Sequence, residues 1–293
     1  MYNFKIAILI LHYKNWTDTN DCVASCLKNL PKNYTIIVID NDEKKNNQSL
    51  YPNIKIINTP TNLGFAGGLN CGINEVYDEY DYFLCLNNDL TLDEKSLDSF
   101  NAMIKREIVQ KGRKIAVLNS PLYDTNNKSK VQAIYGQYNT WTGTTSHINN
   151  FSSWLNYSGT ENYLVGANLL LNKSYLDKNG LLPDQYFLYY EELELCKEIK
   201  KCGWEIEIDI DNKMYHKEHG SVGLKSPIHH FYTTRNTLKY ALKNNKLKFV
   251  FVLGYVCTLY LIGKLFKMRF EELKSSFAGF QAFVMNKEGK WKI

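Results

Sequence analysis

The stretch "KIAILILHYKNW", residues 5–16, joins an uninterrupted apolar run to a polar end, a pattern typical of a strand buried on both faces. Similar runs follow at residues 35–40, 54–57, 81–86 and 114–118 ("TIIVID", "IKII", "DYFLCL" and "KIAVL"). Segments of helical length separate them, at residues 16–30, 65–79 and 93–111. This alternation predicts an α/β fold with a Rossmann-like, mainly parallel sheet and helices on both of its faces.

The rest of the first 225 residues is less regular. Residues 120–160 are rich in Asn, Ser, Thr, Gly and Tyr, and they are compatible with short antiparallel strands or with a mobile loop. Residues 161–171 ("ENYLVGANLLL") are expected to form one more strand, 190–202 a helix that ends before Gly203, and 204–210 a half-exposed strand.

Composition limits the class of protein. The 293 residues are 44% hydrophobic and 22% charged, which suits one large core or a core with a smaller appendage. The number of cysteines, seven, is odd, and none of them has zinc-site spacing, so we expect a reducing cytoplasm. The N-terminus carries one early lysine and no small-residue cleavage site, and we interpret it as a strand rather than a signal peptide.

Charge divides the chain at about residue 225. Residues 226–293 hold 12 Lys and Arg against 3 Asp and Glu, whereas residues 1–225 carry a net charge of −4. We therefore expect a catalytic domain over 1–225 and a basic helical appendage over 226–293. The uncharged run 249–263 spans about 22 Å as a helix, which is too short to cross a bilayer.

Two interpretations of this run remain open, a buried core helix or a helix lying at a membrane surface. In the second, four lysines would contact lipid phosphates: Lys246, Lys248, Lys264 and Lys267.

Polar residues follow three of the expected strands, in "VIDND" (38–42), "NTPTNLGFAGGLN" (58–70) and "CLNNDL" (85–90). The carboxyl ends of parallel strands meet at one edge of a sheet, where α/β proteins bind their ligands. The glycine-rich segment is not a P-loop, and no Rossmann GxGxxG follows the first strand, so an ATPase or a dehydrogenase is disfavoured.

The segment "QYFLYYEELELC", residues 185–196, places four aromatic rings directly before three glutamates. An amphipathic helix would separate the rings from the carboxylates. A catalytic site would instead hold one carboxylate against an apolar wall, which raises its basicity. This segment alone favours the helix.

Seven motifs change that balance: "ILILHYKN", "IIVIDND", "NLGFAGGLN", "FLCLNND", "LVGANLL", "YFLYYEELELC" and "MYHKEHGS". Their order and spacing over residues 5–222 resemble family 2 of the inverting glycosyltransferases, most closely its rhamnosyltransferase-like branch, which "RN" at 235–236 also resembles. The resemblance implies a GT-A fold, a nucleotide-sugar donor and a divalent metal, Mg²⁺ or Mn²⁺.

The resemblance also implies roles for single residues. Asp40 would read the nucleotide base, Asp89 is the last acid of a DXD-like motif, and Glu192 is the catalytic base. The donor site would comprise His12, Tyr13, Asp40, Asn62, Gly67, Asn88 and Asp89. Two departures weaken the match: Asn87 replaces the first DXD acid, and the base is Glu where relatives often have Asp.

Metal and acceptor residues follow from the same resemblance. Asp89 and His216 would bind the metal, with His219 as an alternative ligand. The acceptor site would comprise Gly166, Ala167, Tyr189, Tyr190 and Glu191. Structural roles compete with several of these assignments: Glu191 and Glu194 as ordinary helix charges, Gly166 and Ala167 as a strand bend, and Asn62 and Asn70 as caps of the glycine loop.

The chemistry requires these residue types independently of the resemblance. A departing nucleoside diphosphate accumulates negative charge, which a cation held by Asp89 would neutralise. The acceptor hydroxyl loses a proton as it attacks, and a carboxylate such as Glu192 can accept it. With these requirements added, the site interpretation of residues 185–196 becomes the favoured one.

The sequence therefore predicts a cytoplasmic glycosyltransferase at the inner face of the membrane. It would move a sugar, with dTDP-rhamnose as the first-guess donor and a UDP-hexose as the second, to a polysaccharide or lipid-linked glycan precursor. A nucleotidyltransferase and a catalytically silent nucleotide-sugar-binding subunit are the competing hypotheses. We expect peripheral membrane contact and no nucleic-acid partner, and a homo-oligomer stays open.

Overall fold

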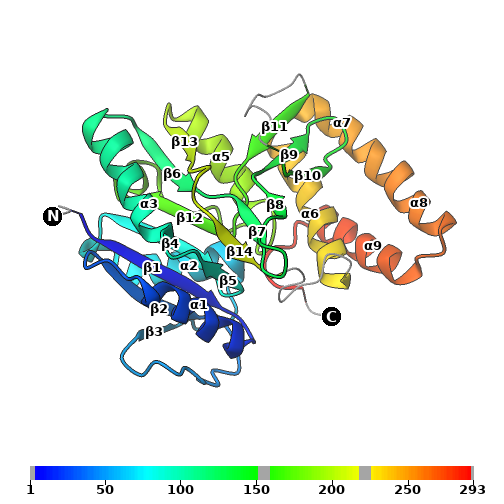
Figure 1. Cartoon of the computed structure of the whole chain (residues 1–293). Helices are drawn as coiled ribbons and strands as arrows, with labels where there is room; N and C mark the ends of the chain where they lie inside the picture. The colour runs from blue at the N-terminus through cyan, green and yellow to red at the C-terminus, as the bar shows by residue number, and fades with distance from the viewer. Residues whose placement is uncertain (1–3, 151–158, 218–225, 292–293) are drawn as a thin grey trace.

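The computed structural model describes residues 4–150, 159–217 and 226–291 (Figure 1). Its main sheet has seven strands in the order β13-β6-β12-β4-β1-β2-β3. These strands are β1 Ile6–His12, β2 Tyr34–Asp40, β3 Lys55–Asn58, β4 Tyr82–Asn87, β6 Ile115–Asn119, β12 Asn168–Asn172 and β13 Glu205–Ile208. Only β12 is antiparallel to its neighbours in this sheet, so the predicted α/β class with a mainly parallel sheet is confirmed.

Both faces of the sheet are covered, which explains why its strands are apolar without alternation. All seven residues of β1 are buried; Ala7 and Leu9 face one core cluster, while Ile6 and Ile8 face the other. The first cluster packs against α2 Gly64–Glu75, α4 Lys173–Asn179 and α5 Glu191–Lys201. The second packs against α1 Trp16–Lys28 and α3 Ser96–Met103, and a π-helical segment, Ile104–Gln110, extends α3.

Two small sheets lie beside the main one. The first has the order β10-β9-β11 and the second β5-β14-β7-β8. Their strands are β5 Leu90–Leu92, β7 Leu122–Asp124, β8 Val131–Ala133, β9 Tyr135–Asn139, β10 Thr145–Ile148, β11 Thr160–Tyr163 and β14 Met214–His216. Residues 120–150 thus contain the short strands that were one of the two expectations for this region.

The single strand expected over residues 161–171 was wrong. The structure divides it into β11 and β12, separated by residues 164–167. The side chain of Asn119 donates to the carbonyls of Val165 and Asn168. At the break, these side-chain bonds take the place of the backbone hydrogen bonds that a neighbouring strand would provide. This bend carries Gly166 to the site described below.

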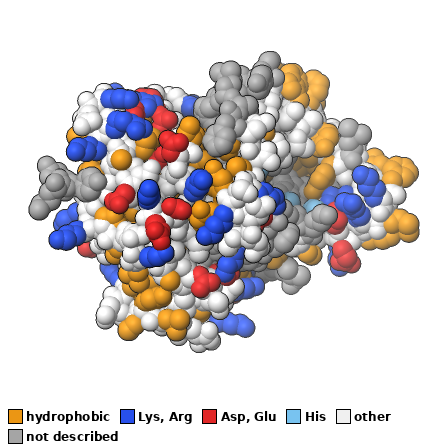
Figure 2. Space-filling view, viewed as in Figure 1, with side chains coloured by type: hydrophobic (Ala, Val, Ile, Leu, Met, Phe, Trp, Pro, Cys, Tyr) orange, Lys and Arg blue, Asp and Glu red, His pale blue; other side chains and the backbone are white. Residues whose placement is uncertain are grey.

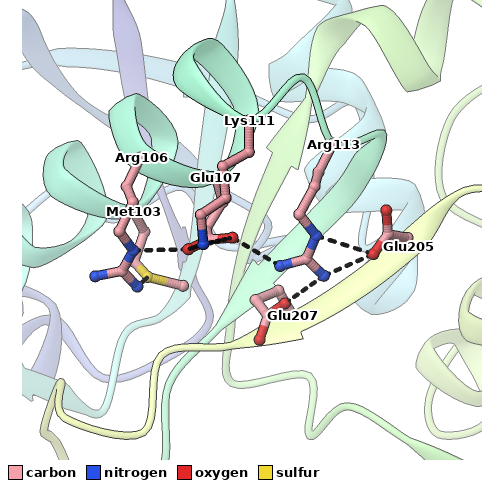
Figure 3. A network of polar contacts seen from close by, with 7 residues as sticks. All are labelled: Met103, Arg106, Glu107, Lys111, Arg113, Glu205 and Glu207. Atoms are coloured by element: carbon pink, nitrogen blue, oxygen red, sulfur yellow. Dashed lines mark hydrogen bonds and ion pairs between the residues drawn. The ribbon is translucent and has the colours of Figure 1, made fainter.

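An ion-pair network ties the edge strand β13 to the end of α3 (Figure 3). The guanidinium of Arg113 contacts the carboxylates of Glu107, Glu205 and Glu207 at 2.6–2.9 Å. Lys111, Arg106 and Arg113 together lower the pKa of Glu107 to about 2. Because Glu107 binds its proton less readily in the folded state, the network stabilises the fold above about pH 4.5 and fails as pH falls towards 2.

The C-terminal region is helical and projects to one side of the sheet domain (Figure 1). It contains α6 Pro227–Asn244, α7 Lys246–Tyr255, the π-helical segment Val256–Tyr260, α8 Leu261–Phe266 and α9 Phe270–Val284. α6 and α9 pack closely, because Gly279 brings α9 against the carbonyl of Phe231, where a Cβ would approach to 2.3 Å.

Two expectations for this region were wrong. The segment Lys246–Phe266 is one continuous 21-residue helix, long and apolar enough to span a membrane by length and composition, although the sequence had suggested too short a run. Lysine is compatible with a helical backbone. The helix therefore continues beyond the uncharged run 249–263 and includes the lysines at its two ends. The membrane-surface interpretation placed Lys264 on lipid phosphates. In the structure Lys264 is buried and pairs with Glu272 at 2.8 Å, so its ammonium group does not face the lipid.

Candidate active site

The carboxyl ends of four strands meet at one edge of the main sheet. His12 at the end of β1 is in register with Asp40 at the end of β2, and Asp40 with Asn58 at the end of β3. On the other side of β1, Leu11 is in register with Asn87. The polar residues that follow these strands therefore converge, as the sequence predicts for three of the strands.

His12 is buried and held in one orientation. Its ring stacks on Trp16 with a centroid distance of 4.0 Å, and its Nδ1 lies 2.7 Å from Thr19 Oγ1. Thr19 Oγ1 also lies 3.1 Å from the carbonyl of Asn15, so a hydroxyl that donates there accepts from Nδ1 of His12. Burial lowers the pKa of His12 below its ordinary value, and the ring is neutral at pH 7.

Asn88 belongs to the same group. Its side-chain amide donates to Thr19 Oγ1 at 3.1 Å and to the carbonyl of Asn15 at 3.3 Å. Asn88 thereby fixes the end of β4 against the start of α1. Its assignment to the donor site stays a prediction.

Asp40 ends β2 and Tyr13 follows β1 at this edge of the sheet. Asp40 is 1% exposed, its Oδ1 accepts from the backbone N–H of Asp42, and Lys45 Nζ lies 3.8 Å from Oδ1. Tyr13 is half-buried, and Lys14 lies over its ring. A buried carboxylate at this edge suits the reading of a polar base edge.

The glycine-rich loop is organised by Asn41, a residue that the sequence analysis did not single out. Its Nδ2 donates to Asn62 Oδ1 and to the carbonyl of Gly64, and its Oδ1 accepts from the N–H of Leu63. Asn62 also accepts from the N–H of Gly64. It therefore caps the glycine loop, which was the structural alternative to a role in the donor site. Gly67, on the first turn of α2, packs against Leu63.

Asn70 lies farther along α2 and does not cap this loop. It pairs with the backbone of Leu182 in both directions, at 2.8 and 3.1 Å, and joins α2 to the segment that leads to α5.

Asp89 and His216 come together from β4–β5 and β14. Asp89 Oδ1 is buried, has no hydrogen-bond partner among the described residues, and lies 3.4 Å from His216 Nε2. Gln132 receives a hydrogen bond from His216 Nδ1 at 3.1 Å and donates to the carbonyl of His216. With Nδ1 bonded to Gln132, Nε2 is the ring nitrogen that faces Asp89 and could ligate a metal, an arrangement usual for metal-binding histidines.

These two residues fit a divalent cation as a partial ligand set. Two ligand atoms that lie at right angles about 2.1 Å from one ion are about 3 Å apart, close to the observed 3.4 Å. Within residues 4–150, 159–217 and 226–291, no group of three or more His, Cys, Asp or Glu side chains could hold a metal. His219, the alternative ligand, lies outside the described residues.

Glu192 lies on the first turn of α5 and faces the bend between β11 and β12. A Cβ on Gly166 would lie 3.6 Å from its carboxyl carbon and equally close to the ring of Phe65. Its Oε2 is buried without a hydrogen-bond partner in the described chain. Burial raises the pKa of Glu192 to about 7, as the apolar-wall interpretation of this segment requires.

The neighbouring acids differ from Glu192. Glu191 is 4% exposed, and burial together with the charge of Glu192 raises its pKa well above the ordinary value. Glu194 is held by Lys243 at 2.7 Å and by the hydroxyl of Tyr186, and these partners lower its pKa although burial alone would raise it. Glu194 therefore has the structural role expected for it, though as a buried ion pair rather than on a solvated face.

The aromatic segment before α5 has an unusual backbone. Phe187, Tyr189 and Tyr190 have φ values of 66°, 67° and 80°, a region that costs a bulky residue on the order of 1–3 kcal/mol. Tyr189 is half-buried, whereas Tyr190 is buried with its hydroxyl 2.9 Å from the carbonyl of Gly143 and 2.5 Å from Thr237. The contacts of Tyr190 favour a structural role over sugar stacking.

Ala167 is buried next to Gly166, and its carbonyl accepts from the N–H of Asn87 at 2.9 Å. This bond joins the bend under Glu192 to the DXD-like end of β4. Glu192 and Asp89 thus belong to elements in direct contact, whereas Gln132, Thr19 and Asn41, all missed above, support the site from outside. Asn41 stands within the quoted segment "VIDND" (38–42), whereas the sequence around Thr19 and Gln132 carries no recognisable signal.

Comparison with known proteins identifies relatives by sequence and by fold. A family model described as glycosyl transferase family 2 matches residues 7–180. Among curated proteins, none matches. GalNAc-T7, solved with UDP, GalNAc and Mn²⁺, superimposes with a TM-score of 0.59 at 12% identity, over 80% of this chain and 48% of that one.

Two further structures share the fold. Residues 1–349 of TarS from S. aureus, solved with UDP-GlcNAc, give a TM-score of 0.55 at 15% identity over 96% of this chain and 81% of that chain. The mannosyltransferase PcManGT from Pyrobaculum calidifontis, solved with GDP-Man and Mn²⁺, gives 0.54 at 10% identity over 99% and 77%. This chain spans about half the length of GalNAc-T7. The match to the family model covers more than half of the chain, which therefore belongs to glycosyl transferase family 2.

Proposed function

We propose that this chain is an inverting glycosyltransferase that moves one sugar from a nucleoside-diphosphate donor to a hydroxyl of a polysaccharide or lipid-linked oligosaccharide precursor. The observation that carries the proposal is the carboxyl group of Glu192. The side chain is half-buried beside Phe65 and Gly166, and its Oε2 is buried and unpartnered in the described chain, beside the edge where the strand ends converge. A helix with a solely structural role gives no reason to bury this carboxylate without a partner.

In this mechanism the acceptor hydroxyl approaches the anomeric carbon from the side of Glu192. The new bond forms between the acceptor oxygen and that carbon while the bond to the diphosphate breaks, and one displacement inverts the configuration. The proton of the hydroxyl passes to Glu192. A carboxylate with a pKa of about 7 is a stronger base than an ordinary glutamate and is still substantially ionised at neutral pH.

On the donor side, Asp89 and His216 would hold the cation, and Gln132 would keep the imidazole in the tautomer that can ligate. A divalent cation there supplies charge neutralisation for the departing diphosphate. Two of the three structural relatives described above were solved with Mn²⁺, which supports including Mn²⁺ beside Mg²⁺. Asp40 would contact the base.

The donor is proposed as dTDP-rhamnose first and a UDP-hexose second. The structural relatives were solved with uridine or guanosine nucleotides, so both belong in any test. A thermal-shift screen of the full chain with dTDP-rhamnose, UDP-GlcNAc, UDP-glucose and GDP-mannose, with and without Mn²⁺, tests the donor. A ligand at 100 times its Kd stabilises the native state by about 2.7 kcal/mol. If no nucleotide raises the melting temperature, the proposal fails.

A catalytically silent binding subunit is the second candidate, because Asn87 stands where the first acid of the DXD motif would be. Such a subunit would give the same thermal shift but would release no nucleoside diphosphate from the donor. Slow hydrolysis of the bound donor by wild-type protein, measured as nucleoside diphosphate, therefore separates the two candidates.

We also propose that the helix Lys246–Phe266 lies in the membrane surface, on the cytoplasmic side. Only 19% of its most apolar 18-residue window is buried, which does not fit a core helix. Phe266 and Phe251 are 83% and 58% exposed. Figure 2 shows hydrophobic side chains gathered at the far end of the C-terminal helices with Lys and Arg side chains beside them.

Contacts at both ends of this helix favour an in-plane orientation over a spanning one. Near its start, Lys248 Nζ donates to Thr140 Oγ1 at 2.7 Å. Near its end, Lys264 packs against His230 of α6 and Glu272 of α9. A spanning helix would place its two ends about 30 Å apart on opposite sides of the bilayer and would break one set of contacts.

We expect the chain to co-sediment with vesicles of phosphatidylcholine containing 30% phosphatidylglycerol better than with pure phosphatidylcholine, and to be released as salt rises. Basic residues near an anionic surface contribute about 1 kcal/mol each, and salt screens this contribution. Phe266→Glu should weaken binding by more than about tenfold, because burying a phenylalanine contributes roughly 1.5–3 kcal/mol.

Leu50→Glu is the matched control, since Leu50 is 73% exposed and lies before β3, far along the chain from the helix. Binding that resists high salt and yields only to detergent would indicate a spanning helix. Equal, negligible pelleting with both kinds of vesicle would leave a solvated appendage.

A further inference from the structure

The segment Tyr186–Tyr190 enters α5 with three aromatic residues in the left-handed region of the backbone. The N-cap of α5 is Tyr190, with φ 80° and no side-chain capping bond. Glu192 follows two residues later, so the rotation at Tyr190 sets the direction of the first turn that carries it. Such a backbone persists only where surrounding groups hold it.

The groups that hold this segment come from another helix. The side-chain Nδ2 of Asn236 on α6 donates to three backbone carbonyls of this segment. They belong to Tyr186 at 3.1 Å, Leu188 at 2.8 Å and Tyr189 at 3.0 Å. Two amide hydrogens are thus shared among three acceptors. Of the two other carbonyls, that of Phe187 accepts from the N–H of Phe65 in the glycine-rich loop at 2.8 Å, and that of Tyr190 accepts from the N–H of Glu194 at 3.0 Å.

Arg235 fixes the orientation of this amide. Its Nε donates to Asn236 Oδ1 at 2.9 Å, which directs Nδ2 towards the carbonyls, and its Nη2 donates to the carbonyl of Tyr186 at 2.5 Å. The guanidinium is 2% exposed, lies 4.9 Å from the centre of the Tyr232 ring, and also donates to the carbonyl of Gly289. Asn236 itself is fully buried.

From this geometry we propose that Asn236, oriented by Arg235, is a positioning residue for Glu192, so that α6 belongs to the active site and not to an appendage. The inference rests on the proposed role of Glu192 as the base. Asn236 acts by holding the backbone of residues 186–190, which determines where the carboxyl group points and how much water reaches it.

A shift in the pH profile would distinguish positioning from simple stabilisation. The titratable groups that surround Glu192 are Tyr163 of β11, Tyr189 and Tyr190 of the held segment, and Glu191 and Cys196 of α5. Burial among these groups favours the neutral carboxyl. If the segment loosens, water reaches Glu192, its pKa returns towards the ordinary value, and the acid limb of the activity profile moves to lower pH.

The test compares Asn236→Ala and Asn236→Asp with Thr233→Ala, whose hydroxyl bonds only within α6 among the described residues. In Asn236→Ala we expect faster amide hydrogen exchange in a peptide covering residues 185–192. We also expect an unchanged Kd for the nucleotide, kcat lower by about 10- to 100-fold, and the acid limb shifted to lower pH. Asn236→Asp keeps the shape but replaces the donor by an acceptor, so it should not rescue.

Hydrogen exchange reports on the segment without any turnover, which separates this inference from the proposed function. If Asn236→Ala exchanges faster but even the wild type never turns over a nucleotide-sugar donor, the role of Glu192 as base is wrong. The role of Asn236 in holding residues 186–190 would still stand. Exchange and pH profile like those of Thr233→Ala would overturn the proposal. If Asn236→Ala does not fold, Arg235→Lys keeps the charge but loses the Nε donor, and the same changes are expected in smaller measure.

Discussion

We expect Glu192→Gln to lower kcat by about 100-fold or more while the Kd of the nucleotide donor changes little. Glutamine keeps the size and polarity of the side chain beside Gly166, but it cannot accept the proton of the acceptor hydroxyl. Steady-state kinetics of the full chain, together with a binding isotherm for the donor, measure both quantities.

Glu198→Gln on the same helix is the matched control, because that side chain is 38% exposed and pairs with Lys243 at the surface. Its activity should stay close to that of the wild type. Activity of Glu192→Gln within threefold of the wild type would transfer the role of base to Glu191 or Asp184.

The same substitution has a second signature in stability. Because the pKa of Glu192 is raised from 4.5 to about 7 in the folded chain, its contribution to stability is complete below about pH 4.5 and is lost as pH rises through 7. Gln has no such loss. The free energy of unfolding of Glu192→Gln should therefore exceed that of the wild type by up to about 3 kcal/mol at pH 8, with a higher melting temperature, and the two should be similar near pH 4.5. Wild-type kcat/KM should rise with pH through about 7.

The second large effect is expected at Asp89. Asp89→Asn should leave the fold intact and weaken donor binding in the presence of Mn²⁺ by at least about tenfold, because even supporting residues of metal sites typically contribute 10- to 100-fold to affinity. The buried Oδ1 that faces His216 would become an uncharged amide atom. Donor affinity measured calorimetrically with Mn²⁺ and with EDTA gives the metal response directly.

Asp98→Asn is the control for the loss of one negative charge, since Asp98 is exposed on α3. Its metal response should equal that of the wild type. If Asp89→Asn binds the donor as wild type does under both conditions, Asp89 is not a ligand and the cation site must be sought elsewhere.

The sheet could be predicted from the sequence because each central strand is buried on both faces. Such a strand is recognisable in the sequence as a continuous run of apolar residues. Residues 161–171 contain such a run as well, but what divides it is the side chain of Asn119, more than 40 residues away. Local periodicity carries no information about such a partner. The same limit applies to Asn236 and its hold on Tyr186.

The residue types of the site were more accessible than their support. Residues 185–196 alone favoured an amphipathic helix, and the family resemblance was needed to select Glu192, whose pKa burial raises to about 7 in the structure. The pairing of His216 with Asp89 follows from strand register between β14 and β5, which motif order alone could suggest only through the family resemblance. Gln132 could not be found this way, because it lies on β8 within a stretch of ordinary polar residues.

The hold of α6 on residues 186–190 has a consequence for engineering chimeras of this enzyme. A truncation after residue 225 would remove Asn236, whose side chain donates to three backbone carbonyls beside Glu192. We therefore expect such a fragment to lose the backbone geometry that positions Glu192. α9 must also be kept, because it covers α6 at Gly279. The helix Lys246–Phe266 is anchored as well, because Lys248 donates to Thr140 and Lys264 pairs with Glu272 of α9. A chimera should therefore change only exposed side chains of this helix, such as Phe251 and Phe266, which would alter the proposed membrane contact while the held segment beside Glu192 stays intact.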